Sequence, residues 1–204
     1  MKQIMVDLDD TLVSFSEMFC DRWNRYIRKY APYFSGSYIN VSLKDITEYD
    51  LLKSLKQFYQ NNGCKDTYSL SSYFENCLKE MFSDESFYNN PYLTPEYNHI
   101  FRLLKTTFKD DKIILNTKVS TFEMMISKAR WLNQNKDFEI FDEIILDMEK
   151  TSEHTPKPTH YDVMIDDAPH NIITYLEKNP NGIVYMPLRA FNKHLKDNKR
   201  ILVL

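Results

Sequence analysis

The chain has 204 residues, which fits one domain or one core domain with a modest insertion. Its 3 glycines provide no glycine-rich phosphate loop, so the dinucleotide-binding and P-loop motifs are both excluded. Any phosphate must therefore be held in another way than by a glycine-rich loop. A net charge of −3, with basic residues spread along the chain, argues against a long nucleic acid as partner.

The remaining composition indicates the compartment. Cys20, Cys64 and Cys77 are odd in number and lack metal-ligand spacing, which predicts reduced structural thiols in a cytoplasmic protein. The first residues include no long apolar signal region, and no stretch approaches the length of a membrane span. We expect no membrane partner, and a homodimer is compatible with the sequence.

The first element is a short apolar run, 4–6, which predicts a buried strand. Three carboxylates follow within four positions, at Asp7, Asp9 and Asp10. Like charges this close repel, and burying them is costly unless a cation compensates. Mg²⁺ prefers hard oxygen ligands and leaves room for a substrate phosphate. A helix N-cap would explain one polar residue here but not three carboxylates, so we favour a metal site.

The segment 14–93 differs from the rest of the chain because it has many aromatic residues and no clear strand. Helical spacing predicts an early helix with an aromatic stripe, a helix over 42–62 and another over 69–82. We interpret 14–93 as a helical insertion, or cap, between the first and second strands of a core formed by 1–13 and 94–204.

Apolar runs of strand length recur beyond the insertion, separated by helical patterns over 120–135 and 169–178. The runs are continuous rather than alternating, as suits a parallel sheet covered on both faces. The expected strands lie at 113–115, 144–146, 163–165, 183–185 and 201–204. We therefore predict an α/β fold: a Rossmannoid parallel sheet flanked by helices, with a small helical cap inserted after the first strand.

Polar residues at the carboxyl ends of the expected strands form the candidate site, because ligands of open parallel sheets bind there. Thr117 follows the second strand, the pair Asp166-Asp167 follows a later one, and Lys157 lies shortly before that pair. Each has an ordinary alternative: Thr117 or one aspartate could cap a helix, and Lys157 could be a solvated loop lysine. Together with the first loop they indicate metal ligands, a nucleophile and phosphate partners.

These residues carry a family likeness. The stretch Asp7-Leu8-Asp9-Asp10-Thr11 resembles the DxDx[TV] motif of the haloacid dehalogenase (HAD) superfamily. Thr117, Lys157 and the pair Asp166-Asp167 are similar in type and order to the second, third and fourth motifs of that superfamily. The four motifs together are specific for this superfamily.

The likeness is stronger to one branch, the 5′(3′)-deoxyribonucleotidases. The segments 128–132, 163–167 and 86–88 resemble, in turn, that branch's helix after the second motif, its acidic motif and its return from the cap. The chain departs from the branch at Asp10-Thr11, where Gly-Val is usual, and at Lys118-Val119, where Ser-Pro is usual.

The resemblance implies a Mg²⁺-dependent phosphatase that forms an aspartyl-phosphate. Asp7 would be the nucleophile, and Asp9 would protonate the leaving oxygen and then activate water. The implied metal ligands are Asp7, the backbone carbonyl of Asp9, and Asp167, with Asp166 as the alternate carboxylate. The residues expected to bind phosphate are Thr117, Lys118 and Lys157.

The resemblance also implies (deoxy)nucleoside monophosphates as substrates, which would give nucleoside and phosphate. The candidates for stacking on a base are Phe15, Phe19, Trp23, Phe87 and Tyr88, with Phe15 the best placed for substrate contact, although ordinary core packing is the simpler role for any one of these rings. The alternatives are a HAD phosphatase for a sugar phosphate or another small ester, one for a nucleic-acid 3′-phosphate, and a non-catalytic HAD-fold binding protein. Because Asp7 and Asp9 are both present, we favour an enzyme.

Overall fold

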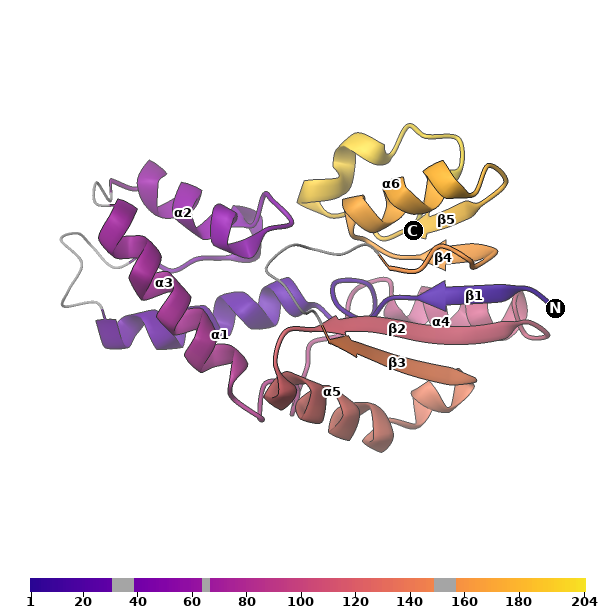
Figure 1. The fold of residues 1–204 in the computed structure, drawn as a ribbon, viewed down its shortest axis with the longest axis horizontal. Coiled ribbons are helices and arrows are strands. Elements are labelled where there is room, and N and C mark those ends of the chain that lie inside the picture. The colour runs from indigo at the N-terminus through magenta and orange to yellow at the C-terminus, as the bar shows by residue number, and fades with distance from the viewer. Residues whose placement is uncertain (31–38, 64–66, 149–156) are drawn as a thin grey trace.

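The computed structural model describes residues 1–30, 39–63, 67–148 and 157–204. Within these residues, a layer built on a parallel sheet lies beside a group of helices, and the molecule is elongated along the direction that joins the two (Figure 1). The strands point their carboxyl ends towards the helical group. Side chains that follow the strands therefore lie between the two parts.

Six strands of the described chain form the sheet, in the order β3-β2-β1-β4-β5-β6, with each neighbouring pair parallel. Their bounds are β1 Gln3–Val6, β2 Lys112–Val119, β3 Glu143–Met148, β4 Val163–Ile165, β5 Ile183–Met186 and β6 Ile201–Val203. The α/β prediction is confirmed. β1 is central, so the loops after β1, β2 and β4 meet at one edge of the sheet.

β2 is longer than the sequence suggested. It continues to Val119 because its last residues pair with β3, with Thr117 opposite Leu146 and Lys118 opposite Asp147. Thr117 therefore lies inside a strand instead of following one. It does not cap the next helix either, because Thr121 does so by accepting a hydrogen bond from the backbone N of Met124 at 3.1 Å.

Helices cover both faces of the sheet. Ile4 and Val6 of β1 pack on the face covered by α4 and α5, and Met5 between them packs on the face covered by α6. Figure 1 shows α6 on the near side of the sheet and α4 on the far side. The bounds are α4 Tyr97–Thr106, α5 Phe122–Gln134 and α6 Pro169–Lys178. The buried strands read as continuous apolar runs because both of their faces are covered.

The helical group consists of α1, a short 3₁₀ helix η2, α2 and α3. Their bounds are α1 Phe15–Tyr30, η2 Leu43–Asp45, α2 Leu51–Asn61 and α3 Thr67–Phe82. The expected single helix over 42–62 was wrong. The chain turns extended at Ile46 after η2, and Asp50 caps a new helix by accepting from the backbone N of Lys53 at 3.0 Å. No helix in the described ranges combines the length and apolarity needed to cross a bilayer.

An aromatic core holds these helices together. Trp23 of α1 is fully buried, with its ring 5.1 Å from Phe74 of α3 and 6.0 Å from Phe19. Its indole N–H donates to the hydroxyl of Tyr59 in α2 at 3.2 Å. Burying such rings supplies much of the stabilising apolar area of a small helical unit. The aromatic stripe of the sequence is thus largely a packing feature. Cys20 and Cys77 are buried, and Cys64 lies outside the described residues.

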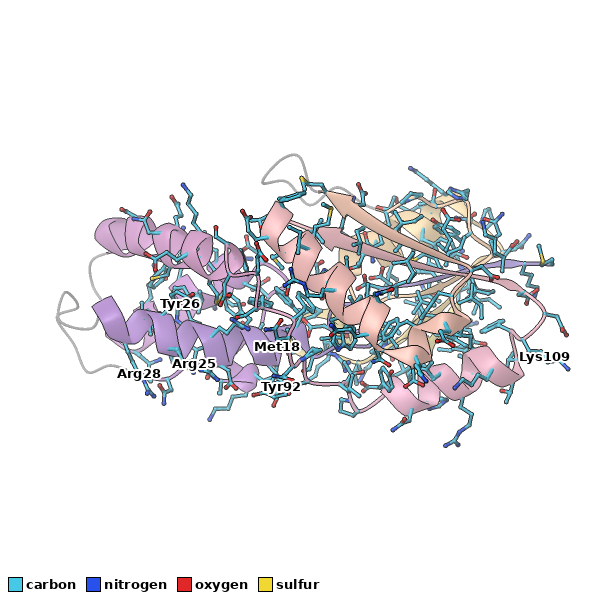
Figure 2. The ribbon with its side chains drawn as sticks, turned by 90° about the horizontal axis from the view of Figure 1, so that it is seen from below. Met18, Arg25, Tyr26, Arg28, Tyr92 and Lys109 are labelled. Atoms are coloured by element: carbon cyan, nitrogen blue, oxygen red, sulfur yellow. The ribbon has the colours of Figure 1, made fainter. Side chains whose placement is uncertain are left out.

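The chain enters and leaves the helical group through two adjacent segments. The backbone N of Ser14 donates to the carbonyl of Tyr92 at 2.8 Å, and that of Thr94 donates to the carbonyl of Leu12 at 3.0 Å. The Tyr92 hydroxyl also donates to Asp21 of α1 at 2.6 Å. Figure 2 shows Tyr92 at the junction between the helical group and the sheet layer.

Candidate active site

Three aspartates gather where β1 and β4 end side by side. Asp7 directly follows β1, and Asp166 and Asp167 directly follow β4. All three are buried, and one carboxylate oxygen from each lies within 4.8 Å of the others. Burial, with the neighbouring carboxylates, raises the pKa of Asp7 to about 7 and raises that of Asp167 well above its usual range. A cation placed among them would relieve this cost.

Asp166 is already satisfied by protein donors. Its Oδ1 accepts from the backbone N of Ala168 at 2.8 Å. Its Oδ2 accepts from Asn171 Nδ2 at 3.1 Å and from Lys157 Nζ at 3.2 Å. With both oxygens engaged, Asp166 orients the surrounding groups and has little capacity left for a further ligand.

Asp167 has a free oxygen. Its Oδ1 accepts from the Thr11 hydroxyl at 3.0 Å, but its Oδ2 is buried with no hydrogen-bond partner among the described residues. A buried carboxylate oxygen without a partner is costly unless an ion or a water completes it. Beside Asp7, this oxygen suits a hard cation such as Mg²⁺. The residues present therefore fit the expected metal, with Asp167 better placed than Asp166 to bind it.

Lys157 belongs to the same cluster. Its side chain is buried, and Nζ donates to Asp7 Oδ1 as well as to Asp166. Burial lowers the pKa of Lys157, but the charges of Asp166 and Asp7 outweigh burial and raise the pKa above its ordinary value, so the amine stays protonated. The solvated-loop alternative is therefore wrong for this lysine. Its charge is available to a phosphate bound beside Asp7.

Asp9 is held by Lys128, a residue that was not expected in the site. Lys128 of α5 has a fully buried side chain, and its Nζ donates to Asp9 Oδ2 at 2.5 Å, to Thr117 Oγ1 at 2.9 Å and to the carbonyl of Lys118 at 2.6 Å. A signal was present in the sequence. Met124, Lys128 and Leu132 are four residues apart, so a lysine occupies a position on the inward face of an apolar helix.

Tyr88, which the sequence suggested only as a candidate for stacking on a base, also contacts Asp9, and this contact was not predicted. It is fully buried, and its hydroxyl donates to Asp9 Oδ1, the oxygen that Lys128 does not contact. The ring lies 5.2 Å from the Lys128 ammonium. Both Asp9 oxygens therefore have a donor, while the Asp9 side chain remains 25% exposed and faces the cavity described below.

Asp10 connects the first loop to α1. Its φ of 54° lies in the left-handed region, which glycine adopts more readily than aspartate. One carboxylate oxygen accepts from the backbone N of Ser16 at 2.8 Å, and the other accepts from the Ser16 hydroxyl at 2.5 Å. On the core side, Arg189 Nε donates to the Asp10 carbonyl at 3.0 Å and Arg189 pairs with Glu96. Asp10 is therefore part of the joint between the core and the helices.

A cavity of about 750 Å³ opens between this loop cluster and the helical group. Its lining includes charged residues at the sheet end and apolar residues from the helices. At the helical end the lining residues are Phe15, Leu51, Leu52, Leu78 and Phe82, with Asp50 and Glu75. At the sheet end they include Asp9, Asp10, Lys118 and Asp167. The cavity can therefore take a molecule with one charged end and one apolar end.

Two other expected site residues, Phe87 and Thr117, lie off the cavity wall. Phe87 is buried with its ring 5.5 Å from that of Phe15, so the structure places it in the core behind Phe15. Thr117 is fully buried against Lys128. Lys118 reaches the cavity, but its Nζ is paired with Asp147 at 2.5 Å. Of the two phenylalanines, Phe15 is the one placed to touch a ligand.

No protein-family model and no curated protein matches the chain, whereas solved structures match it over nearly its whole length. A predicted phosphatase from Clostridium acetobutylicum has a TM-score of 0.62 at 15% identity, with 100% of this chain and 94% of that chain covered. A haloacid dehalogenase-like hydrolase from Streptococcus pneumoniae has a TM-score of 0.60 at 13% identity, covering 100% and 93%. A predicted phosphoglycolate phosphatase from Haemophilus somnus has a TM-score of 0.60 at 14% identity, covering 98% and 93%. The chain has the fold of the HAD-like hydrolases.

Proposed function

We propose that this protein is a Mg²⁺-dependent phosphatase that hydrolyses a small phosphate monoester through an aspartyl-phosphate on Asp7. The observation that carries the proposal is the buried cluster of three carboxylates, one with an oxygen that has no hydrogen-bond partner among the described residues. Lys157 donates into this cluster, and Asp9 faces the cavity beside it. Phosphoryl transfer needs this kind of charge neutralisation and positioning more than it needs reactive side chains.

The first half of the reaction uses Asp7. Mg²⁺ held by Asp7 and Asp167 would supply positive charge that offsets the carboxylates and the substrate phosphate. An Asp7 oxygen would form a bond to phosphorus as the bond from phosphorus to the ester oxygen breaks. Lys157 would stabilise the phosphate oxygens, since its ammonium is charged and already lies within the cluster.

Asp9 would serve both halves. It would first give a proton to the departing ester oxygen, so that the product leaves as an alcohol. It would then take a proton from a water that attacks the aspartyl-phosphate, which releases inorganic phosphate and regenerates the Asp7 carboxylate. Its partly exposed side chain at the cavity wall suits this double role.

Two substrate classes are each favoured by one observation. The description of one structural neighbour as a phosphoglycolate phosphatase favours a small ester such as a sugar phosphate or phosphoglycolate. The volume of the cavity and the apolar helical wall around Phe15, Leu78 and Phe82 favour a larger leaving group with a flat apolar surface, as in a nucleoside monophosphate. A cavity of about 750 Å³ favours a mononucleotide over the end of a long polymer such as a nucleic-acid 3′-phosphate.

A panel of phosphate esters, assayed with Mg²⁺ and with chelator, tests the proposal. The panel would include p-nitrophenyl phosphate, nucleoside 5′- and 3′-monophosphates, sugar phosphates, phosphoglycolate and a 3′-phosphorylated oligonucleotide. We expect release of phosphate that requires Mg²⁺ and Asp7. If no ester is hydrolysed by the metal-loaded protein, the phosphatase assignment fails. The kcat/KM ranking decides between the substrate classes.

A further inference from the structure

Both carboxylate oxygens of Asp9 accept a hydrogen bond, and the two donors come from different parts of the chain. Lys128 of α5 holds Oδ2, and the hydroxyl of Tyr88 holds Oδ1. Tyr88 lies on the segment that returns from α3 to the core, far from Asp9 in the sequence. We propose that Tyr88 is a positioning residue for proton transfer: its hydroxyl sets the orientation of the Asp9 carboxyl. The proposal rests on the proposed function.

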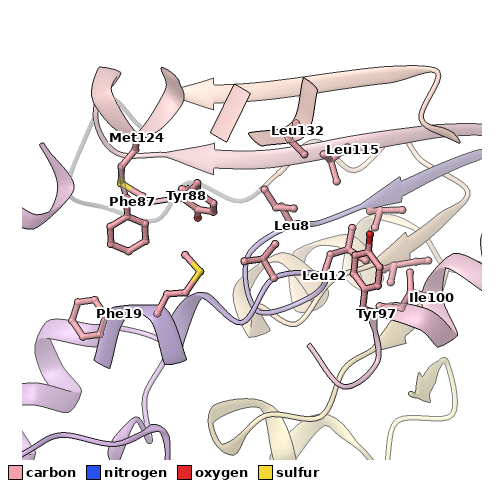
Figure 3. Packing of buried hydrophobic residues seen from close by; sticks show 14 of the residues in the cluster. Leu8, Leu12, Phe19, Phe87, Tyr88, Tyr97, Ile100, Leu115, Met124 and Leu132 are labelled. Atoms are coloured by element: carbon pink, nitrogen blue, oxygen red, sulfur yellow. The ribbon is translucent and has the colours of Figure 1, made fainter. Parts of the chain in front are cut away.

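Tyr88 is itself rigidly placed. Its backbone N donates to the hydroxyl of Ser127 in α5 at 2.8 Å, one residue before Lys128. Its ring lies 5.4 Å from that of Phe87, and its side chain is fully buried. Figure 3 shows Tyr88 beside Phe87 in the buried cluster that extends through Leu8. A hydroxyl fixed in this way can hold a carboxylate, whereas a mobile surface tyrosine could not.

The second hydrogen bond matters because Lys128 alone would leave the Asp9 carboxyl group free to rotate. The Lys128 ammonium divides its donors among Asp9, Thr117 and a backbone carbonyl, so it fixes one Asp9 oxygen. Fixing the other oxygen as well defines the plane of the carboxyl group. Each carboxylate oxygen accepts at two positions, so the oxygen that binds Tyr88 keeps a position for a proton in transfer. Proton transfer depends strongly on such geometry.

Tyr88→Phe tests the proposal because it removes one oxygen and keeps the ring. The substrates would be phenyl phosphate, whose leaving group needs a proton, and p-nitrophenyl phosphate, whose leaving group does not. We expect kcat/KM for phenyl phosphate to fall about 10- to 100-fold and kcat/KM for p-nitrophenyl phosphate to fall much less, because kcat/KM reports the half-reaction in which the leaving group departs. A merely structural effect would lower activity on both esters alike.

Tyr97→Phe is the matched control. Tyr97 is also buried and also donates to a carboxylate, Asp137, at 2.8 Å, but it lies away from the cavity. This variant should hydrolyse both esters as the unchanged protein does. Thermal unfolding of both variants shows whether either loss reflects folding.

Three results would overturn the role given to Tyr88. They are unchanged kcat/KM values in Tyr88→Phe, equal losses of kcat/KM on the two esters, and a loss that Tyr97→Phe reproduces. If the unchanged protein hydrolyses esters and its activity requires Asp9, such results contradict only the role of Tyr88 and leave the proposed function standing. If the unchanged protein hydrolyses neither ester with Mg²⁺, the proposed function and the role of Tyr88 fall together.

Discussion

The two ends of the cavity differ in origin and in chemistry. The sheet end is made by loops that follow central strands, and it presents Asp9, Asp10 and Asp167. The helical end is made by α2 and α3, and it presents mainly apolar side chains such as Leu51 and Leu78. On the proposed function, we expect the sheet end to bind the phosphate and the helical end to select the group attached to it. Each end can be altered separately.

Asp7→Asn should have the largest effect. It keeps the shape of the side chain but removes the nucleophile, so hydrolysis of every ester should fall to background. A loss of activity on every ester would mean that the sheet end is needed whatever group the phosphate carries. Phosphate release from p-nitrophenyl phosphate measures it.

Asp111→Asn is the control for this change. Asp111 accepts from the backbone N of Lys2 at 2.7 Å, away from the carboxylate cluster, so its loss should leave the rate unchanged. Turnover by Asp7→Asn at the rate of the unchanged protein would contradict the nucleophile assignment.

The aspartates at the sheet end should make the stability of the folded protein depend on pH. The pKa of Asp7 is about 7 in the folded protein and that of Asp10 about 6, against 3.8 for an ordinary aspartate. Between these values the folded state holds protons that the unfolded state has released, so the metal-free protein loses stability as the pH rises from about 4 to about 7. We expect a lower Tm at about pH 7.5 than at about pH 5.5.

Added Mg²⁺ should raise the Tm more at the higher pH, because the ligands are then deprotonated. Asp7→Asn should flatten the pH dependence of the metal-free protein. A Tm of the metal-free protein that rises between the two pH values would show that other groups dominate.

Leu78→Ala alters the helical end. Removing about 1–2 kcal/mol of apolar contact should raise KM for the best substrate of the panel about 5- to 30-fold, with kcat largely kept. The rate constant for p-nitrophenyl phosphate should change less, because its leaving group is smaller. Leu103→Ala is the control, because Leu103 is a partly buried leucine of α4 that does not line the cavity. Equal loss on all esters would argue against selection by the helices.

Asp10 belongs to the sheet end and joins it to α1 through Ser16, and its variants should have the smallest effect. Asp10→Gly and Asp10→Ala both remove the contacts with Ser16, but only glycine accepts a φ of 54° without strain. Asp10→Gly should therefore be more stable than Asp10→Ala by about 1 kcal/mol. Urea unfolding of the two variants measures the difference, and equal stabilities would mean that the loop relaxes when Asp10 is replaced.

Sequence reasoning located what depends on local pattern. The strand over 163–165 and the helix over 169–178 were placed correctly because an apolar run and an initial proline mark them. Polar residues at strand ends led to the carboxylate cluster and to Lys157. Topology brings those ends together, so their order along the chain was informative.

What the sequence left hidden depends on tertiary contacts. Lys128 and Tyr88 belong to the site only because α5 and the returning segment pack beside Asp9. The extension of β2 to Val119 depends on pairing with β3, and the division of the 42–62 helix depends on a second cap residue inside one apolar pattern. None of these is set by the residues of one segment alone.

The paired entry and exit of the helical group have a consequence for how such chains diversify. Val13 and Leu93 form an antiparallel β-bridge. The two ends of the insertion are therefore already adjacent in the backbone of the sheet layer. A short turn from one to the other would close the sheet layer without the helices. The same junction would accept a different helical unit, so a new leaving-group pocket could be grafted onto unchanged chemistry.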